Sequence, residues 1–224
     1  MKTVFSILLI GILACALQVA SRAQSKSTKQ GQAAAQKQKQ AKIDLLWKQS
    51  DEAFHNGNYP LAISYHKAIV ALDPHDVESY SDAAWLMWSL GHGDEAQQHI
   101  NRGIAANLKD WNMWDAAGQQ DDLQKYFSKA EFAFSQAVKF IPAKEDSQML
   151  RRRWAHAAEN AGNIKTAIGI WQQLVKNYPN EAVNKNNLNR ILHPQSAAPV
   201  KSNLKQAAFW PVKVFLAPLL SLCA

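Results

Sequence analysis

From residue 43 to residue 192, apolar side chains recur at the three- and four-residue spacing that places them on one face of an α-helix. Glycine and proline interrupt this pattern on a regular schedule. Glycine adopts the left-handed backbone that ends a helix, and proline disfavours helical geometry in the residue before it. The stops therefore predict paired helices joined by short turns. After a first helix that ends near residue 56, the predicted helices are 59–72, 77–90, 94–107, 110–124, 127–140, 147–161, 164–177 and 181–192.

A longer period underlies the helical one. Ala62, Ala96 and Ala130 stand 34 residues apart, which is the length of one helix–turn–helix unit. Such a unit cannot bury its apolar face alone, so successive units stack into a solenoid. From Ala130 to the corresponding Ala167 the step is 37 residues, which predicts a three-residue insertion within 143–147.

The units resemble tetratricopeptide repeats, a family with fixed aromatic, small and bulky positions around a turn and a proline at the end. The second and third units carry this pattern in Tyr80, Ala84, Gly91, Ala96, Ile100 and Gly103, and in Trp114, Gly118, Phe127, Ala130, Phe134, Ala137 and Pro142. Small residues let two helices approach closely, and bulky residues fill the space beside them. Four positions depart from the pattern: Lys125 replaces a turn glycine, Gly93 and Arg151 each replace an aromatic residue, and His66 replaces a core ring.

The resemblance implies an all-α fold, a right-handed α-solenoid of helix–turn–helix repeats with a C-terminal capping helix. The repeat domain covers residues 43–192, with units 43–76, 77–110, 111–147 and 148–180 and the cap at 181–192. An array of this kind needs a cap to cover its last apolar surface.

The N-terminal residues 1–23 have the features of a secretory signal peptide. Lys2 provides a positive start, an apolar stretch follows, and small residues precede a predicted cleavage site after Ala23. Two alternatives are lipidation at Cys15 and an uncleaved membrane anchor. We therefore expect an exported protein, periplasmic or extracellular.

Two further segments lie outside the repeats. Residues 24–42 are rich in Gln, Lys and Ala, and we expect a disordered or weakly helical spacer. Residues 193–224 form a linker and an apolar tail, in which Pro211 and Pro218 argue against a regular membrane-spanning helix. The tail could dock on the array, contact a membrane surface or remain disordered.

The positive net charge of +7 does not belong to the repeats. Ten of the 25 Lys and Arg lie in 1–42 and 193–224, which contain no acid, so 15 bases face all 18 acids in 43–192. Nucleic-acid binding requires a basic face on the folded body. The charge distribution therefore disfavours nucleic acid as a partner.

No sequence motif indicates catalysis or a bound cofactor. The chain has no His-Glu-x-x-His motif, no phosphate-binding loop and no nucleophile elbow. The repeat region also has no cysteine, which excludes a thiolate metal site there. We therefore predict a protein that is not an enzyme and has neither cofactor nor metal.

In the family that the units resemble, the first helix of each unit lines a concave groove, and we predict that a partner binds there. The predicted contact residues are Trp47, Asp51, Glu78, Trp85, Trp88, Asp115, Gln119, Asp122, Arg152 and His156. Trp85 and Trp88 are the most informative, because Tyr80 and Ala84 already supply the core of their unit. The alternative is that both rings pack on the next unit.

Acidic and aromatic side chains together favour a ligand that is basic, apolar or a sugar. We therefore predict a non-catalytic, exported scaffold that binds a peptide or protein in its concave groove. The alternative is a membrane-tethered structural or assembly subunit, attached through its N-terminal segment or its apolar tail. Carbohydrate binding is a third hypothesis, and the sequence predicts no oligomeric state.

Overall fold

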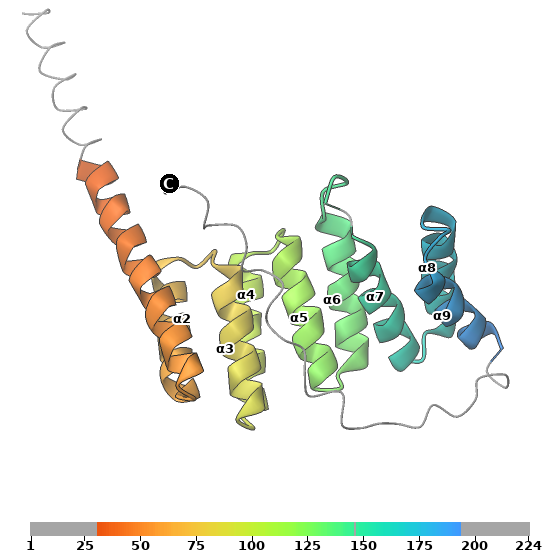
Figure 1. Cartoon of the computed structure of the whole chain (residues 1–224), viewed down its shortest axis with the longest axis horizontal. Helices are drawn as coiled ribbons and strands as arrows, with labels where there is room; N and C mark the ends of the chain where they lie inside the picture. Colours follow the sequence, from red (N-terminus) through yellow and green to blue (C-terminus); the bar gives the residue numbers. More distant parts are fainter. Residues whose placement is uncertain (1–30, 146, 194–224) are drawn as a thin grey trace, which may run out of the picture.

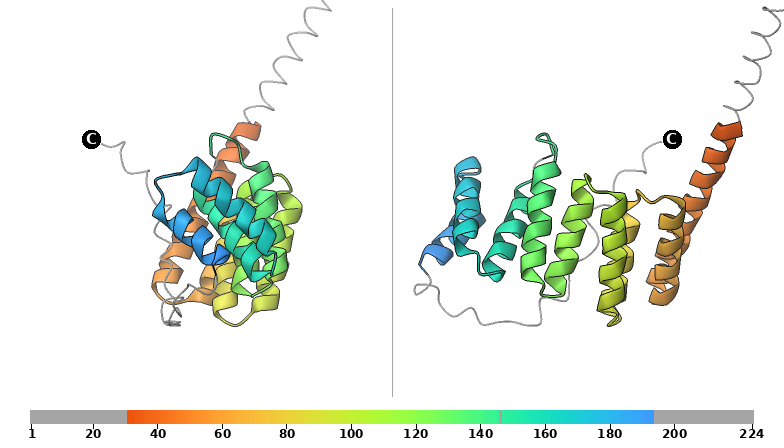
Figure 2. Two further views of the ribbon diagram at one scale, coloured as in Figure 1. Left: turned by 90° about the vertical axis from the view of Figure 1, so that its right-hand side faces the viewer. Right: turned by 180° about the vertical axis from the view of Figure 1, so that it is seen from behind.

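A computed structural model describes residues 31–145 and 147–193, and every regular element within these ranges is an α-helix. The chain is helical over residues 31–55, and the later helices are α2 (Tyr59–Leu72), α3 (Val77–Ser89), α4 (Gly93–Ala106), α5 (Trp111–Leu123), α6 (Phe127–Phe140), α7 (Gln148–Asn160), α8 (Ile164–Asn177) and α9 (Ala182–Leu192). The helices stand in one row in which each packs on its neighbours in sequence (Figure 1), and the same row is seen from behind in Figure 2. The predicted all-α solenoid is confirmed.

The predicted helix boundaries agree with the structure to within one residue. The predicted insertion also appears, because the connection from α6 to α7 spans 141–147, seven residues, whereas the connections 73–76, 107–110 and 178–181 each span four. The three extra residues explain the longer step from the third unit to the fourth.

Each turn between the two helices of a unit has a residue in the left-handed backbone region. Glycine provides it in three units, with φ values of 72° at Gly57, 86° at Gly91 and 83° at Gly162. In the third unit Lys125 adopts the same conformation, with φ 62°, although its Cβ makes this region unfavourable. The turn geometry is therefore kept even where the expected glycine is missing.

The residues that define the period form the packing centre of each unit. The alanines of the second helices are all fully buried: Ala62, Ala96, Ala130 and Ala167. The bulky side chains four residues later are also buried: His66, Ile100, Phe134 and Trp171. In the third unit Phe134 packs directly against Gly118 of the unit's first helix. Small-to-bulky contacts thus set the distance between paired helices.

The polar core residue of the first unit, His66, is buried and hydrogen-bonded. Its Nε2 lies 2.7 Å from the Ser50 hydroxyl, and its Nδ1 lies 3.4 Å from the Ser79 hydroxyl. Burial lowers the pKa of His66 to about 4, which keeps the ring neutral. The predicted packing role of His66 is confirmed.

The segment expected to be a spacer is helical where the structure describes it. Residues 31–42 continue without a break into the first repeat helix, with nearly every side chain exposed. Within the described ranges no helix combines the length and hydropathy that crossing a bilayer requires. The signal peptide predicted for 1–23 lies outside the described residues, and so does all but His193 of the linker and tail predicted for 193–224.

Candidate functional site

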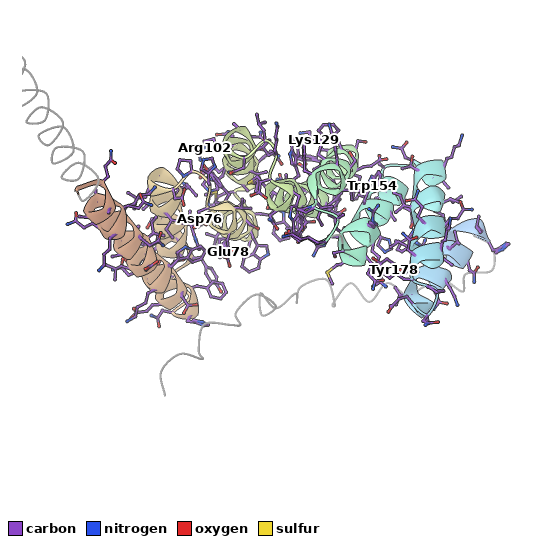
Figure 3. The ribbon with its side chains drawn as sticks, turned by 90° about the horizontal axis from the view of Figure 1, so that it is seen from above. Asp76, Glu78, Arg102, Lys129, Trp154 and Tyr178 are labelled. Atoms are coloured by element: carbon purple, nitrogen blue, oxygen red, sulfur yellow. The ribbon has the colours of Figure 1, made fainter. Side chains whose placement is uncertain are left out.

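The candidate site lies on one side of the row, formed by the first helices of the units. We call it the first-helix face and define it by Glu78, Asp82 and Trp85 of α3, Asp115 and Gln119 of α5, and Arg153 and His156 of α7. Figure 3 shows Glu78 on the opposite side of the row from Arg102 of α4 and Lys129 of α6. The second helices therefore provide the other side.

On α3 the face combines an exposed indole ring with unpaired carboxylates. Trp85 keeps 36% of its surface exposed, and its ring centroid lies 6.4 Å from that of Phe54 in the preceding unit. Asp82 and Glu78 lie on the same helix, one and two turns before Trp85 respectively. Within the described residues, neither carboxylate has a hydrogen-bond or ion-pair partner, so this part of the face presents uncompensated negative charge beside an aromatic ring.

The environment of Asp82 makes its charge costly. Burial raises the pKa of Asp82 to about 7, and the neighbouring carboxylates of Glu78 and Asp76 raise it further in the same direction. The pKa of Glu78 is also raised, by burial and by Asp76. A cation placed among these groups would remove their repulsion.

On α5 and α7 the charges of the face are already paired. Arg153 donates to Oδ2 of Asp115 at 2.6 Å, and the side-chain amide of Gln119 donates to the same oxygen at 3.0 Å. The other oxygen of Asp115 is buried without a hydrogen-bond partner, and burial raises the pKa of this carboxyl. These contacts connect the third and fourth units, so this part of the face has less charge to offer a ligand.

Arg152, a predicted contact residue, forms hydrogen bonds within the repeat array. It donates to the side chains of Asn184 and Gln148, each at 2.7 Å, and to Glu181 at 3.1 Å. Because Asn184 and Glu181 belong to the capping region, Arg152 connects α7 to the last helix of the row.

Of the predicted tryptophans, Trp85 is the more exposed. Trp88 is half-buried and packs against the core cluster around Tyr80 and Met87. Trp47 is also half-buried, and its indole N–H donates to Oδ2 of Asp76 at 3.3 Å. The alternative of packing therefore describes Trp47 and Trp88 better than Trp85.

The remaining predicted residues are Asp51, His156 and Asp122. Asp51 is exposed, and one of its carboxylate oxygens lies 3.3 Å from Nε2 of His55. His156 packs edge-on against Trp171 with ring centroids 5.0 Å apart, and burial lowers its pKa. Asp122 is exposed near Asn160, with a pKa raised by burial. All three residues belong to helices other than α3, which carries Trp85.

Two residues of the face were not predicted. Asp82 follows Glu78 by four residues and Arg153 follows Met149 by four, so helical spacing alone could have selected both. On α7 the prediction instead selected the neighbouring Arg152, because two rows of residues offset by one position fit the same helical period. Only the contacts between units show which of the two adjacent residues faces the neighbouring unit.

Two hollows lie away from this face. One, of about 370 Å³, is lined by residues 125–129 with Asn160 and Ala161, and another, of about 320 Å³, by Trp88, Gly91, Gly93 and residues 123–125. Both are open and lie at the turns between paired helices. Among the described residues, no group of three His, Cys, Asp or Glu side chains is arranged to hold a metal ion.

The raised pKa of Asp82 predicts a pH-dependent stability. Between its unfolded pKa near 4 and its folded pKa of about 7, the folded chain holds a proton that the unfolded chain has lost, so stability falls as pH rises through this window. We expect Asp82→Asn to stabilise the protein at pH 8 by on the order of 2 kcal/mol and to flatten that fall. Urea unfolding at pH 5 and pH 8 measures both effects.

Asp121→Asn is the matched comparison for this experiment. Asp121 is buried elsewhere on α5, and burial raises its pKa to about 6. Its effect should add to that of Asp82→Asn, because the two sites share no contact. If the Asp82→Asn variant keeps the pH dependence of the wild type, the raised pKa of Asp82 is not the cause of that dependence.

Comparison with known proteins agrees with this architecture. Residues 53–120 match the family described as tetratricopeptide repeat, and a search of curated proteins finds no relative. Among solved structures, MamA from Desulfovibrio magneticus RS-1 (residues 41 to the end) is similar with a TM-score of 0.53 at 16% identity, over 67% of this chain and 83% of that one. Pseudomonas aeruginosa PilF gives 0.56 at 12% identity, over 70% of each chain.

A third similar structure is that of Naa15/Naa10 bound to HypK-THB, with a TM-score of 0.53 at 18% identity. The similarity covers 67% of this chain but only 22% of the matched one. At such identities these structures demonstrate the shared fold alone. Together with the family match and the repeated helix pairs, they show a right-handed α-solenoid in which residues 53–120 are tetratricopeptide repeats.

Proposed function

We propose that the protein is an exported, non-catalytic scaffold that binds a peptide or protein partner on the first-helix face, centred on Trp85, Glu78 and Asp82. The tetratricopeptide repeat fold is that of a protein-binding scaffold, and the Naa15/Naa10 structure is itself a complex with HypK. The observation that carries the proposal for this chain is the exposed indole of Trp85 beside two carboxylates that have no partner in the part of the chain that the structure describes.

The chemistry of the face favours a partner segment that is cationic and partly apolar. Tryptophan is a frequent anchor at protein interfaces, because its large ring buries apolar area with little loss of conformational freedom. A lysine or arginine beside it would meet both the ring face and the negative charge of Glu78 and Asp82. An acidic segment would add repulsion to groups whose pKa values are already raised.

Export forms part of the proposal because of the sequence of residues 1–23. A positive start, an apolar stretch and small residues before the cleavage site are typical of a secretory signal. The absence of cysteine from the repeats is compatible with an oxidising compartment, since packing alone stabilises the array.

The proposal predicts that Trp85→Ala weakens partner binding by at least about tenfold, as truncation of an interface anchor does. Partners captured by the full chain would be identified by mass spectrometry, and their affinity measured for each variant. Because more than a third of Trp85 is exposed, the free energy of unfolding should change far less than for a buried tryptophan.

Phe132→Ala is the matched control, because this aromatic side chain is 57% exposed but belongs to α6, a second helix. It should leave the affinity unchanged. Equal affinities for the wild type and a folded Trp85→Ala variant would place the binding site elsewhere.

A further inference from the structure

The unpaired part of the first-helix face complements a segment of the chain itself. Residues 194–224 contain Lys201, Lys205 and Lys213, no acid, and several apolar and aromatic residues. The face offers the opposite character at Glu78 and Asp82, with the exposed ring of Trp85 beside them. Charge and apolar surface are therefore matched between the two.

We propose that residues 194–224 bind back on the first-helix face, with Lys213 at Glu78 and Asp82 and the neighbouring apolar residues against Trp85. The segment would then be an intramolecular competitor of the external partner. This inference rests on the proposed function for the location of the binding face, and it adds a regulatory role.

The reach of the chain permits this contact. Neighbouring packed helices lie about 8–10 Å apart, so the six steps from α9 back to α3 amount to at most about 60 Å. Lys213 lies 20 residues beyond His193, the last residue described, and an extended chain of that length spans about 66 Å. Lys201, at eight residues, spans only about 26 Å, which selects the more distal lysine for the contact.

Attachment also raises the local concentration of the segment. The effect is largest when the relaxed length of the connection matches the span, and here about 20 residues must be nearly extended, so the effective concentration stays well below the millimolar range of short relaxed linkers. The contact therefore depends on the ion pairs and the buried apolar area together, and not on attachment alone. A partner would have to displace it, and weakening the segment would increase the apparent affinity of the partner a few-fold.

The test is zero-length carbodiimide cross-linking of the full chain without any partner, followed by mass spectrometry. The reagent joins a lysine amine to a carboxylate in direct contact. We expect an intrachain link between Lys213 and Glu78 or Asp82 in monomeric protein. Lys67 and Glu95, whose charged atoms lie 4.0 Å apart on different helices, form the internal positive control.

Charge exchange provides the second arm. Glu78→Lys with Asp82→Lys should abolish the link, and adding Lys213→Glu should create a new link of reversed chemistry between residues 78 or 82 and residue 213. No link to Lys213 while the Lys67–Glu95 link forms would overturn the inference, and so would links that join only two chains. A link that persists in the Glu78→Lys, Asp82→Lys double variant at other carboxylates would also contradict it.

The two proposals fail separately. Loss of partner affinity in Trp85→Ala without any link to the C-terminal segment would support the proposed function and overturn this inference. If the cross-link forms but no external partner loses affinity in the Trp85→Ala variant, this inference is supported and the proposed function is contradicted.

Discussion

Replacement of Trp171 by alanine is expected to lower the free energy of unfolding by about 3–5 kcal/mol. The side chain is fully buried, and it is the largest buried group in the cluster formed with Ala155 and Leu174. Its indole N–H also donates to Oε1 of Glu159 at 2.8 Å. Truncation would leave a cavity where α7, α8 and α9 meet. Denaturant unfolding followed by circular dichroism measures the loss.

The solenoid arrangement adds a second expectation for this variant. Because each unit contacts only its neighbours, the damage should stay near α7–α9, and the units around Tyr80 should unfold at higher denaturant concentration. Trp171→Phe is the conservative control, since it keeps most of the volume and loses only the hydrogen bond, at a cost of about 1 kcal/mol. A cost below 1 kcal/mol for Trp171→Ala would show that this centre is not tightly packed.

Replacement of Gly118 by alanine is expected to destabilise the protein by about 1–3 kcal/mol through overpacking, although alanine favours helix formation. A Cβ at this position would lie 2.6 Å from the Cδ1 and Cε1 atoms of Phe134. The ring is buried between α5, α6 and α7 and has little room to move. The clash therefore outweighs the gain of about 0.5–1 kcal/mol in helix propensity.

Gly169→Ala is the matched control for this prediction. Gly169 also lies within a helix, but a Cβ there would meet no atom within 4 Å. This change should stabilise the protein by about 0.5–1 kcal/mol, so the difference between the two variants isolates the clash. Phe134→Leu should relieve part of the cost of Gly118→Ala in the double variant. Equal effects at the two glycines would refute the close contact between α5 and α6.

The internal order of each unit follows from short-range pattern. Ala62, Ala96 and Ala130 predicted the second helices, and the turns at Gly57 and Gly91 appear where glycine supplies the left-handed conformation. Helix periods and stops depend on residues a few positions apart, so they can be recognised without coordinates. Even Lys125 fits, because the surrounding helices impose the turn on it.

The contacts of polar side chains on the first helices could not be predicted from the short-range sequence pattern. Arg153 pairs with Asp115 across 38 residues, and Arg152 contacts Asn184 across 32. Arg152 and Arg153 are adjacent arginines on α7, a residue type that is usually exposed, and the helical period allows either side chain to face outward. Which one faces its neighbour depends on the rotation of one unit against the next.

The sequence by itself determined the repeat length, the helix pairs, the insertion before the fourth unit and the absence of net positive charge from the array, because these depend on spacing and composition. Only the tertiary structure decided that Trp85 remains exposed while Trp88 packs inward, and that Glu78 and Asp82 meet no cation among the described residues while Asp115 pairs with Arg153. Exposure and pairing arise from contacts between units, and the angle at which two helices pack is set by all their side chains together.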